Sequence, residues 1–206
     1  MGEVDPTESL AEFWDRRYRE AERVWSPNPN ALLAAFAGDL PPGRALDVGA
    51  GEGRNAIWLA QSGWSVTALD VSAVALDRAA ARGREEVVEL ECVVADWREH
   101  EVDGPVDLVV ISFMHPHPEE RSRMFERTRS WLAPGGHLFT VGVEAGEHGR
   151  RGPPDRDRLY TPERLREALA GFELLRCETV SYEGESRDGP RPVVDVVAIG
   201  RRPPEG

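Results

Sequence analysis

The stretch Ala45-Leu46-Asp47-Val48-Gly49-Ala50-Gly51-Glu52-Gly53 decides the fold. An apolar run at residues 44–48 leads into the glycines and predicts a short buried strand, and residues 55–61 predict the first turns of a helix. Glycine at every second position allows positive φ angles, so the backbone between the two elements can turn sharply and lie directly against a ligand. A second apolar run, residues 66–69, ends in Asp70, where an acid is placed to hold a ribose.

The glycine spacing separates this loop from two other nucleotide-binding loops. A dinucleotide-binding loop has its third glycine three residues after the second, and Arg54 occupies that position here. No Lys-Ser or Lys-Thr pair is present to form a phosphate loop. Residues 47–53 instead resemble the nucleoside-binding loop of class I S-adenosylmethionine-dependent methyltransferases, in which an acid is followed by three alternating glycines. The alternative is a glycine-rich turn without a ligand, and Asp70 counts against it.

The remaining pattern predicts an α/β fold, because short apolar runs alternate with helix-like segments as in βαβ units. Strands are expected at residues 44–48, 65–70, 89–95, 106–113, 137–143, 173–181 and 193–201, and helices at 7–21, 31–37, 54–62, 72–82, 118–132 and 161–170. The connection between the last two strands has no room for a helix, which indicates an antiparallel pair. We therefore expect a doubly wound, mostly parallel seven-stranded sheet with an antiparallel last strand, the Rossmann-like class I methyltransferase fold.

Length and charge limit the domain organisation and the partners. At 206 residues the chain suits a single methyltransferase domain, 1–206, with an N-terminal helical cap segment at 1–43 and an α/β core at 44–206. The net charge of −12 argues against nucleic-acid and membrane partners and favours a small-molecule acceptor. Two cysteines far apart in sequence predict no metal site. Without a signal peptide or a long apolar segment, a cytoplasmic location is expected; the oligomeric state stays open.

The resemblance implies that the glycine loop binds the methionine and ribose portions of S-adenosylmethionine. Gly49, Gly51 and Gly53 would let the backbone approach these portions closely. Asp47 would meet the amino group or orient a water molecule.

Further cofactor contacts are expected at the ends of the next strands. Asp70, followed by Val71, would accept hydrogen bonds from the two ribose hydroxyls. Asp96 would accept one from the adenine amine while Trp97 packs beside the ring, and Ile111 would pack on the adenine side. For Asp96 the alternative is a solvent-facing loop acid.

Acceptor chemistry is expected after the fourth strand, in Ile111-Ser112-Phe113-Met114-His115-Pro116-His117-Pro118. Phe113 would face the transferred methyl group, and His115 is the candidate general base. His115 and His117 alone make a weak metal pair, and their other interpretation is a rigid turn that caps the following helix. The charged, Gly- and Pro-rich residues 148–158 are the candidate lid.

A closer resemblance is to the tellurite-resistance and thiopurine methyltransferase branch. It lies in residues 51–60 and 63–70, and in the upstream Trp14-x-x-x-Tyr18 with Trp25, and it covers roughly residues 13–143. It implies that Trp14, Tyr18 and Trp25 cover the bound cofactor, whereas packing between helices is the other explanation of these aromatic residues.

The expected activity is methyl transfer from S-adenosylmethionine to a small acceptor by in-line displacement. One alternative is a protein of the same fold that binds the nucleoside as a sensor or partner subunit without catalysis, because binding residues serve both roles. A nicotinamide oxidoreductase conflicts with the glycine spacing.

Overall fold

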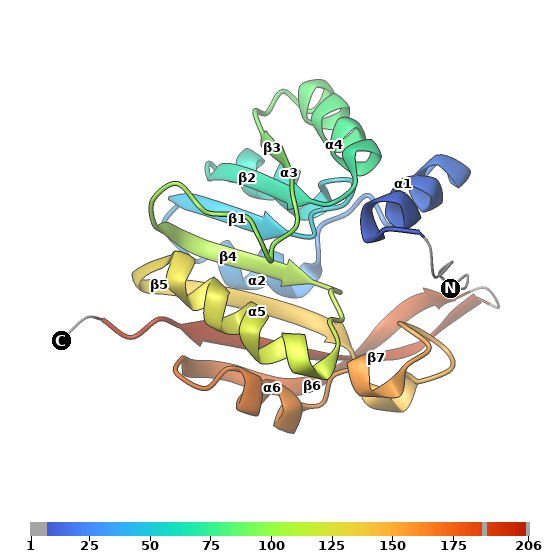
Figure 1. The fold of residues 1–206 in the computed structure, drawn as a ribbon, viewed down its shortest axis with the longest axis vertical. Coiled ribbons are helices and arrows are strands. Elements are labelled where there is room, and N and C mark those ends of the chain that lie inside the picture. Colours follow the sequence, from blue (N-terminus) through green and yellow to red (C-terminus); the bar gives the residue numbers. More distant parts are fainter. Residues whose placement is uncertain (1–7, 187–188, 205–206) are drawn as a thin grey trace. The chain divides into compact units, whose positions relative to one another are not determined.

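The computed structural model describes residues 8–186 and 189–204, with the elements shown in Figure 1. The seven strands form one mixed sheet in the order β3-β2-β1-β4-β5-β7-β6. The chain divides into two compact units, one ending at Val110 and the other beginning at Ile111, and each is described by itself below. The expectation of one domain over 1–206, divided at residue 43, stays a prediction. None of the helices in the described part is long and apolar enough to cross a membrane.

The first unit carries the glycine-rich stretch between its first strand and the helix that follows. Its elements are α1 Leu10–Glu20, α2 Ala31–Ala37, β1 Arg44–Val48, α3 Arg54–Gln61, β2 Ser65–Asp70, α4 Ala73–Glu85, β3 Glu91–Val94 and β4 Val106–Ser112, whose last residues belong to the second unit. β1, β2 and β3 are parallel, with Arg44 opposite Ser65 and Thr67 opposite Glu91. α3 and α4 pack on these strands. Their shared core includes the fully buried Leu46, Leu59 and Leu69, each of which contributes about 1.5–3 kcal/mol of burial free energy.

The helices of this unit begin at side chains that accept backbone hydrogen bonds. Ser9 and Glu12 form a reciprocal capping box at α1. Asn30 accepts from the second and third residues of α2, and Ser72 accepts from Ala75 at the start of α4. Each such cap stabilises its helix by about 1 kcal/mol. The Ser72 cap also fixes the turn that directly follows Asp70.

The second unit contains the antiparallel part of the sheet. Its elements are α5 Pro118–Trp131, β5 Leu132–Val143, two short 3-10 helices at Ala145–Glu147 and Arg156–Arg158, α6 Pro162–Ala168, β6 Glu173–Ser186 and β7 Gly189–Arg201. β7 is antiparallel to β5 and to β6, and β6 and β7 form the long hairpin coloured orange to red in Figure 1. This confirms the antiparallel pair and the fold class expected from the sequence.

Five strands differ from the sequence expectation in at least one boundary. β4 ends one residue early, at Ser112, and β6 and β7 extend further toward the connection between them, to Ser186 and from Gly189. β3 is shorter, because residues 89–90 lie outside the pairing with β2. β5 is longer and begins directly after α5, so Pro134, Gly135 and Gly136, which were expected to precede the strand, belong to it. The backbone of Arg202 explains this: it accepts from the Gly135 N–H at 2.9 Å and donates to the Gly136 carbonyl at 2.8 Å, which extends the sheet by these residues.

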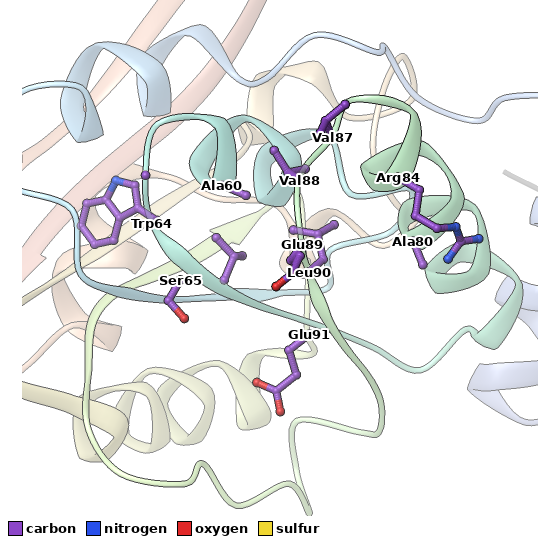
Figure 2. Close-up of a pocket in the computed structure, with 12 residues that line it drawn as sticks. Ala60, Trp64, Ser65, Ala80, Arg84, Val87, Val88, Glu89, Leu90 and Glu91 are labelled. Carbon is purple, nitrogen blue, oxygen red and sulfur yellow. The ribbon is translucent and has the colours of Figure 1, made fainter.

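The first unit has a surface depression of about 860 Å3. Figure 2 shows residues that line it. Its lining includes Trp64 and Ser65, at the start of β2, and residues 87–91, which lead into β3. Asp70 lies at the opposite, carboxyl end of β2. This depression is therefore separate from the glycine-loop site.

α4 ends in a Schellman motif with an unusual residue at its left-handed position. The N–H of Val88 donates to the Gly83 carbonyl at 2.9 Å, and the N–H of Val87 donates to Arg84 at 3.2 Å. Val87 has φ 59° and is 89% exposed. A β-branched side chain in this conformation is strained, and here it forms little packing in return.

Val87→Gly is therefore expected to raise the free energy of unfolding by about 1 kcal/mol, because glycine adopts positive φ without the Cβ clash. Urea unfolding would measure the change. Glu85→Gly, an exposed position within the same helix, is the matched control and is expected to lower stability by about 1 kcal/mol. Destabilisation by Val87→Gly would contradict the strain argument.

Candidate cofactor site

The glycine loop is held against the acid that ends β2. Gly49, Gly51 and Gly53 have φ of 70°, 55° and 75°. The Gly51 N–H donates to Asp70 Oδ2 at 2.8 Å, and the Ser72 N–H donates to Asp70 Oδ1 at 2.9 Å. Burial raises the pKa of Asp70, and these backbone hydrogen bonds oppose the rise. The carboxylate thus joins the loop after β1 to the turn after β2.

Two of these glycines are required by close neighbours as well as by backbone conformation. A Cβ at Gly51 would lie 2.7 Å from the Tyr18 hydroxyl oxygen, and one at Gly53 would lie 2.7 Å from the Ala79 Cβ. Both distances are well inside van der Waals contact. Gly51 therefore leaves room for the N-terminal segment, and Gly53 leaves room for α4.

Two aromatic residues of the N-terminal segment, Tyr18 and Trp25, lie at Gly51, and Trp14 lies beside Tyr18. Trp25 Nε1 donates to the Tyr18 hydroxyl at 3.0 Å, and the Trp25 ring would lie 3.7 Å from a Cβ at Gly51. The Trp14 and Tyr18 rings are 6.0 Å apart. Tyr18 is buried, whereas Trp25 is 41% exposed. The structure brings together this expected aromatic group, called the aromatic cap below, and the loop that it was expected to cover.

Glu52, within the glycine-rich loop, binds the backbone at Val24 and Trp25. This role was not predicted from the sequence. Its Oε2 accepts from the N–H groups of Val24 and Trp25 at 3.1 and 3.2 Å. Its Oε1 lies 3.1 Å from Arg78 Nη1, which also donates to the Glu22 carbonyl. The only sequence signal for a role of Glu52 is its position between two loop glycines. The loop pattern allows any residue there, so the pattern itself predicts no role for it.

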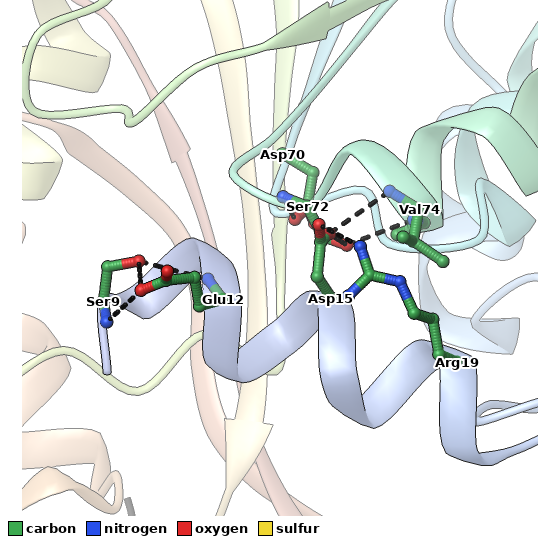
Figure 3. A network of polar contacts seen from close by, with 8 residues as sticks. Ser9, Glu12, Asp15, Arg19, Asp70, Ser72 and Val74 are labelled. Carbon is green, nitrogen blue, oxygen red and sulfur yellow. Dashed lines mark hydrogen bonds and ion pairs between the residues drawn. The ribbon is translucent and has the colours of Figure 1, made fainter. Parts of the chain in front are cut away.

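Asp15 is a second residue that sequence reasoning missed, and Figure 3 shows its contacts. Its Oδ1 accepts from the Ser72 hydroxyl at 2.6 Å and from the Val74 N–H at 3.2 Å, and its Oδ2 lies 3.0 Å from Arg19 Nη2. The carboxylate thereby ties α1 to the start of α4, one turn from Asp70. No local pattern links these positions, because 57 residues separate Asp15 from Ser72.

Asp47 is buried with one oxygen unpaired. The residue is 1% exposed, and its Oδ2 has no hydrogen-bond partner among the described residues. Burial raises the pKa of Asp47 to about 7, while the nearby Arg54 acts to lower it. An unsatisfied buried carboxylate oxygen is costly. Its environment fits a ligand that supplies a positively charged hydrogen-bond donor.

The raised pKa of Asp47 predicts that the stability of the ligand-free protein depends on pH in an unusual way. The carboxyl binds a proton more tightly when folded, with a pKa of about 7, than when unfolded, at about 3.9. Its contribution to stability is therefore complete below about pH 4 and is lost as the pH rises to about 7. Asp47→Asn should remove that loss and exceed the wild type in stability at pH 8, by up to about 4 kcal/mol.

Urea unfolding at pH 4.5 and pH 8 would test this expectation. The advantage of Asp47→Asn should be much smaller at pH 4.5. Asp77→Asn, which removes an exposed carboxylate on α4, is the control and should show no comparable pH-dependent gain. An equal advantage of Asp47→Asn at both pH values would contradict the prediction.

The residues expected at the adenine lie directly after β3. Asp96 Oδ1 accepts from the Arg98 N–H at 2.9 Å, and its Oδ2 lies 2.6 Å from Arg98 Nη1. Trp97 is buried, and the Arg98 guanidinium lies 5.3 Å from its ring centroid. The Ala95 N–H donates to the Asp70 carbonyl at 3.0 Å, which brings this segment beside Asp70 and the half-buried Val71.

Comparison with known proteins assigns this arrangement to a family. Residues 45–136 match the family model of a methyltransferase domain. A ubiquinone biosynthesis O-methyltransferase of Cronobacter sakazakii is 31% identical over 143 residues, which cover 68% of this chain and 59% of that protein. The chain belongs to the class I S-adenosylmethionine-dependent methyltransferases. It spans about 60% of the length of the first curated relatives that it matches.

Solved structures share the methyltransferase fold. A structure from work on thioacetal formation in echinomycin biosynthesis covers 95% of this chain and 92% of its own, with TM-score 0.79 and 21% identity. TehB from Haemophilus influenzae covers 93% of this chain and 66% of its own, with TM-score 0.70 and 17% identity.

The cofactor of this methyltransferase family is S-adenosylmethionine, and the first unit fits it. The fit rests on the unpaired Asp47 oxygen for an ammonium group, on Asp70 for hydroxyl groups, and on the positive φ angles of the loop glycines, whose backbone lies against Asp70.

In the second unit of the methyltransferase, His115 is held by the backbone. Its Nε2 accepts from the Val143 N–H at 3.0 Å, and Arg158 Nε donates to its carbonyl at 2.7 Å. Burial, and then the charge of Arg158, lowers the pKa of His115 to about 3. The imidazole is therefore neutral at physiological pH and its basic nitrogen is occupied. This geometry does not support the expected role of general base.

The other residues expected near the acceptor show different surroundings. Ile111 is fully buried in β4. Phe113 has φ 57°, a strained conformation for a residue other than glycine, and packs against Val143 and Leu159. His117 begins α5 without a side-chain cap, and its Nδ1 lies 3.9 Å from Asp155. Within residues 8–186 and 189–204, no three potential metal ligands gather at one place.

The segment expected as a lid is folded onto itself. His148 Nε2 lies 2.8 Å from the Pro154 carbonyl oxygen. Arg164 Nη2 lies 2.8 Å from Asp157 Oδ1, and its Nη1 donates to the Leu159 carbonyl at 2.9 Å. A lid function of residues 148–158 stays a prediction.

Proposed function

We propose that this protein transfers the methyl group of S-adenosylmethionine to a small-molecule acceptor. The observation that carries the proposal is the contact between the glycine loop and Asp70, in which Gly51 donates to the carboxylate at 2.8 Å. That contact leaves further lone pairs of Asp70 beside a backbone with no side chain at Gly51. A nucleoside ribose needs such an acceptor at the end of the second strand, beside the glycine loop.

Each part of the cofactor has a proposed partner in the first unit. Asp47 binds the ammonium group, and Asp70 with Val71 binds the ribose. Asp96 and Trp97 hold the adenine. The backbone at Gly49, Gly51 and Gly53 accommodates the methionine portion, and the aromatic cap of Trp14, Tyr18 and Trp25 covers it.

When bound, the cofactor supplies a methyl group on a positively charged sulfur, which is open to in-line attack. The work of the protein is then to align the acceptor and to exclude water. Alignment can contribute as much as about 7–11 kcal/mol. The Tyr18 and Trp25 contacts at Gly51 provide the water-excluding cover on the side of the first unit.

An acceptor that is already an anion, such as a thiolate, fits the second unit better than an alcohol. An alcohol needs a base, and Nε2 of His115 is occupied by a backbone N–H. Arg121 and Arg158 form no ion pair with a carboxylate among the residues that the structure describes, and burial lowers the pKa of both. Two such guanidinium groups favour an anion nearby. The net charge of −12 supports a small acceptor, and a cytoplasmic location is part of this proposal.

Calorimetry and a turnover assay on the full chain test the proposal. S-adenosylmethionine and S-adenosylhomocysteine should both bind, and S-adenosylhomocysteine should be released with thiols or small anions faster than with phenols, amines or RNA. Binding without turnover on any of these acceptors would favour the non-catalytic alternative. Absence of binding would overturn the cofactor assignment.

A further inference from the structure

The arginines of α1 differ in how their charge is balanced. Arg16 lies 2.9 Å from Glu8 and 3.6 Å from Glu20, and Arg19 lies 3.0 Å from Asp15. Arg17 forms no ion pair within the described part of the chain, and its Nε is buried with no hydrogen-bond partner there. One guanidinium of this helix is therefore left without an anion.

Arg17 lies inside the aromatic cap. Its guanidinium carbon is 6.0 Å from the ring centroid of Trp14 and 6.0 Å from that of Trp25. Trp25 donates to the Tyr18 hydroxyl, which lies directly over Gly51. The cation is thus held between two indoles, next to the groups that cover the glycine loop.

The position of the Arg17 guanidinium destabilises the ligand-free protein, and an anionic ligand would offset this loss of stability. Cation–π contacts with the two indoles stabilise a partly exposed guanidinium only weakly. A buried guanidinium nitrogen without a hydrogen-bond acceptor destabilises the protein more, because nothing replaces its lost hydration. A carboxylate accepts two parallel hydrogen bonds from the guanidinium fork, so it is the anion that this side chain binds best.

The other charged groups of the site indicate which carboxylate this is. Asp47 offers its unpaired oxygen to an ammonium group, and Asp70 accepts hydroxyl hydrogens. Glu52 is already paired with Arg78. We propose that Arg17 binds the carboxylate at the amino-acid end of S-adenosylmethionine. This assignment rests on the proposed function, and it makes Arg17 a determinant of cofactor specificity.

The test compares S-adenosylmethionine with its decarboxylated analogue, which retains the ammonium group, sulfonium and nucleoside. Calorimetry on the wild type should show tighter binding of S-adenosylmethionine. Arg17→Met should weaken binding of S-adenosylmethionine about 10- to 100-fold and leave binding of the analogue unchanged within about twofold. Arg17→Lys keeps the charge without the fork and should lie between the two proteins. Arg16→Met, on the same helix, should leave both affinities unchanged.

The outcomes separate binding from structural roles. If Arg17→Met weakened the binding of both ligands equally, the side chain would only support the aromatic cap. That result would overturn the proposal. Unchanged affinity for both ligands would overturn it as well. If the wild type bound neither ligand, the proposed function itself would fail, a result distinct from failure of the Arg17 assignment alone.

Discussion

Asp70→Ala is expected to weaken S-adenosylmethionine binding by at least about 100-fold. Hydrogen bonds to a charged acceptor contribute about 1.5–3 kcal/mol each, and two ribose hydroxyls are expected to donate to this carboxylate. A loss of about 3 kcal/mol corresponds to about 100-fold in affinity. The variant also removes the acceptor for the Gly51 and Ser72 N–H groups, which frees the loop that the cofactor needs in place. Calorimetry would measure the loss.

Two controls make the Asp70 result interpretable. Asp77→Ala removes an exposed carboxylate from the neighbouring helix α4 and should leave affinity unchanged. A thermal melt should show that Asp70→Ala still unfolds cooperatively. A folded Asp70→Ala protein with wild-type affinity would refute the ribose role of this residue.

The second large effect is expected from a single added methyl group at Gly51. In Gly51→Ala the new Cβ would lie 2.7 Å from the Tyr18 hydroxyl oxygen, on a residue with φ 55°. The clash should displace the aromatic cap, and the backbone strain should shift the loop. We expect at least about a 30-fold loss of cofactor affinity, equivalent to about 2 kcal/mol.

A double variant separates the clash from the strain. The next Tyr18 atom lies 3.7 Å from the added Cβ, so Tyr18→Phe removes the clashing oxygen alone. Gly51→Ala combined with Tyr18→Phe should therefore recover part of the lost affinity. Gly135→Ala imposes a similar strain at φ 81° with no neighbour within 4 Å, and should leave cofactor binding unchanged. If the double variant bound no better than Gly51→Ala, the proposed steric link between cap and loop would be wrong.

Local patterns in the sequence predicted the first unit well. The bounds of β1, β2 and α2 agree with expectation, because each is marked by an apolar run that ends in a glycine, an acid or a cap. The antiparallel hairpin was predicted from the length of its connection, although β6 and β7 both extend further toward that connection than their apolar runs. Backbone pairing at a sheet edge can continue through polar residues, which hydrophobic periodicity does not detect.

Sequence reasoning failed where function depends on distant partners. The link from Asp15 to Ser72 and the unpaired state of Arg17 depend on how α1 packs, which a local pattern does not encode. His115 was chosen as a base for its chemical type and position. Its low pKa comes from burial and from Arg158, which lies 43 residues away in sequence.

The contacts of the N-terminal segment have a consequence for where the working unit begins. The family match starts at residue 45, whereas Asp15, Tyr18 and Trp25 all precede it and contact the loop or the turn beside it. A protein trimmed to the matched boundary would retain every glycine of the loop and yet leave Gly51 bare to solvent. The boundary of the family match therefore leaves out residues that contact the glycine loop, and we expect a fragment that still binds the cofactor to begin no later than the start of α1 at Leu10.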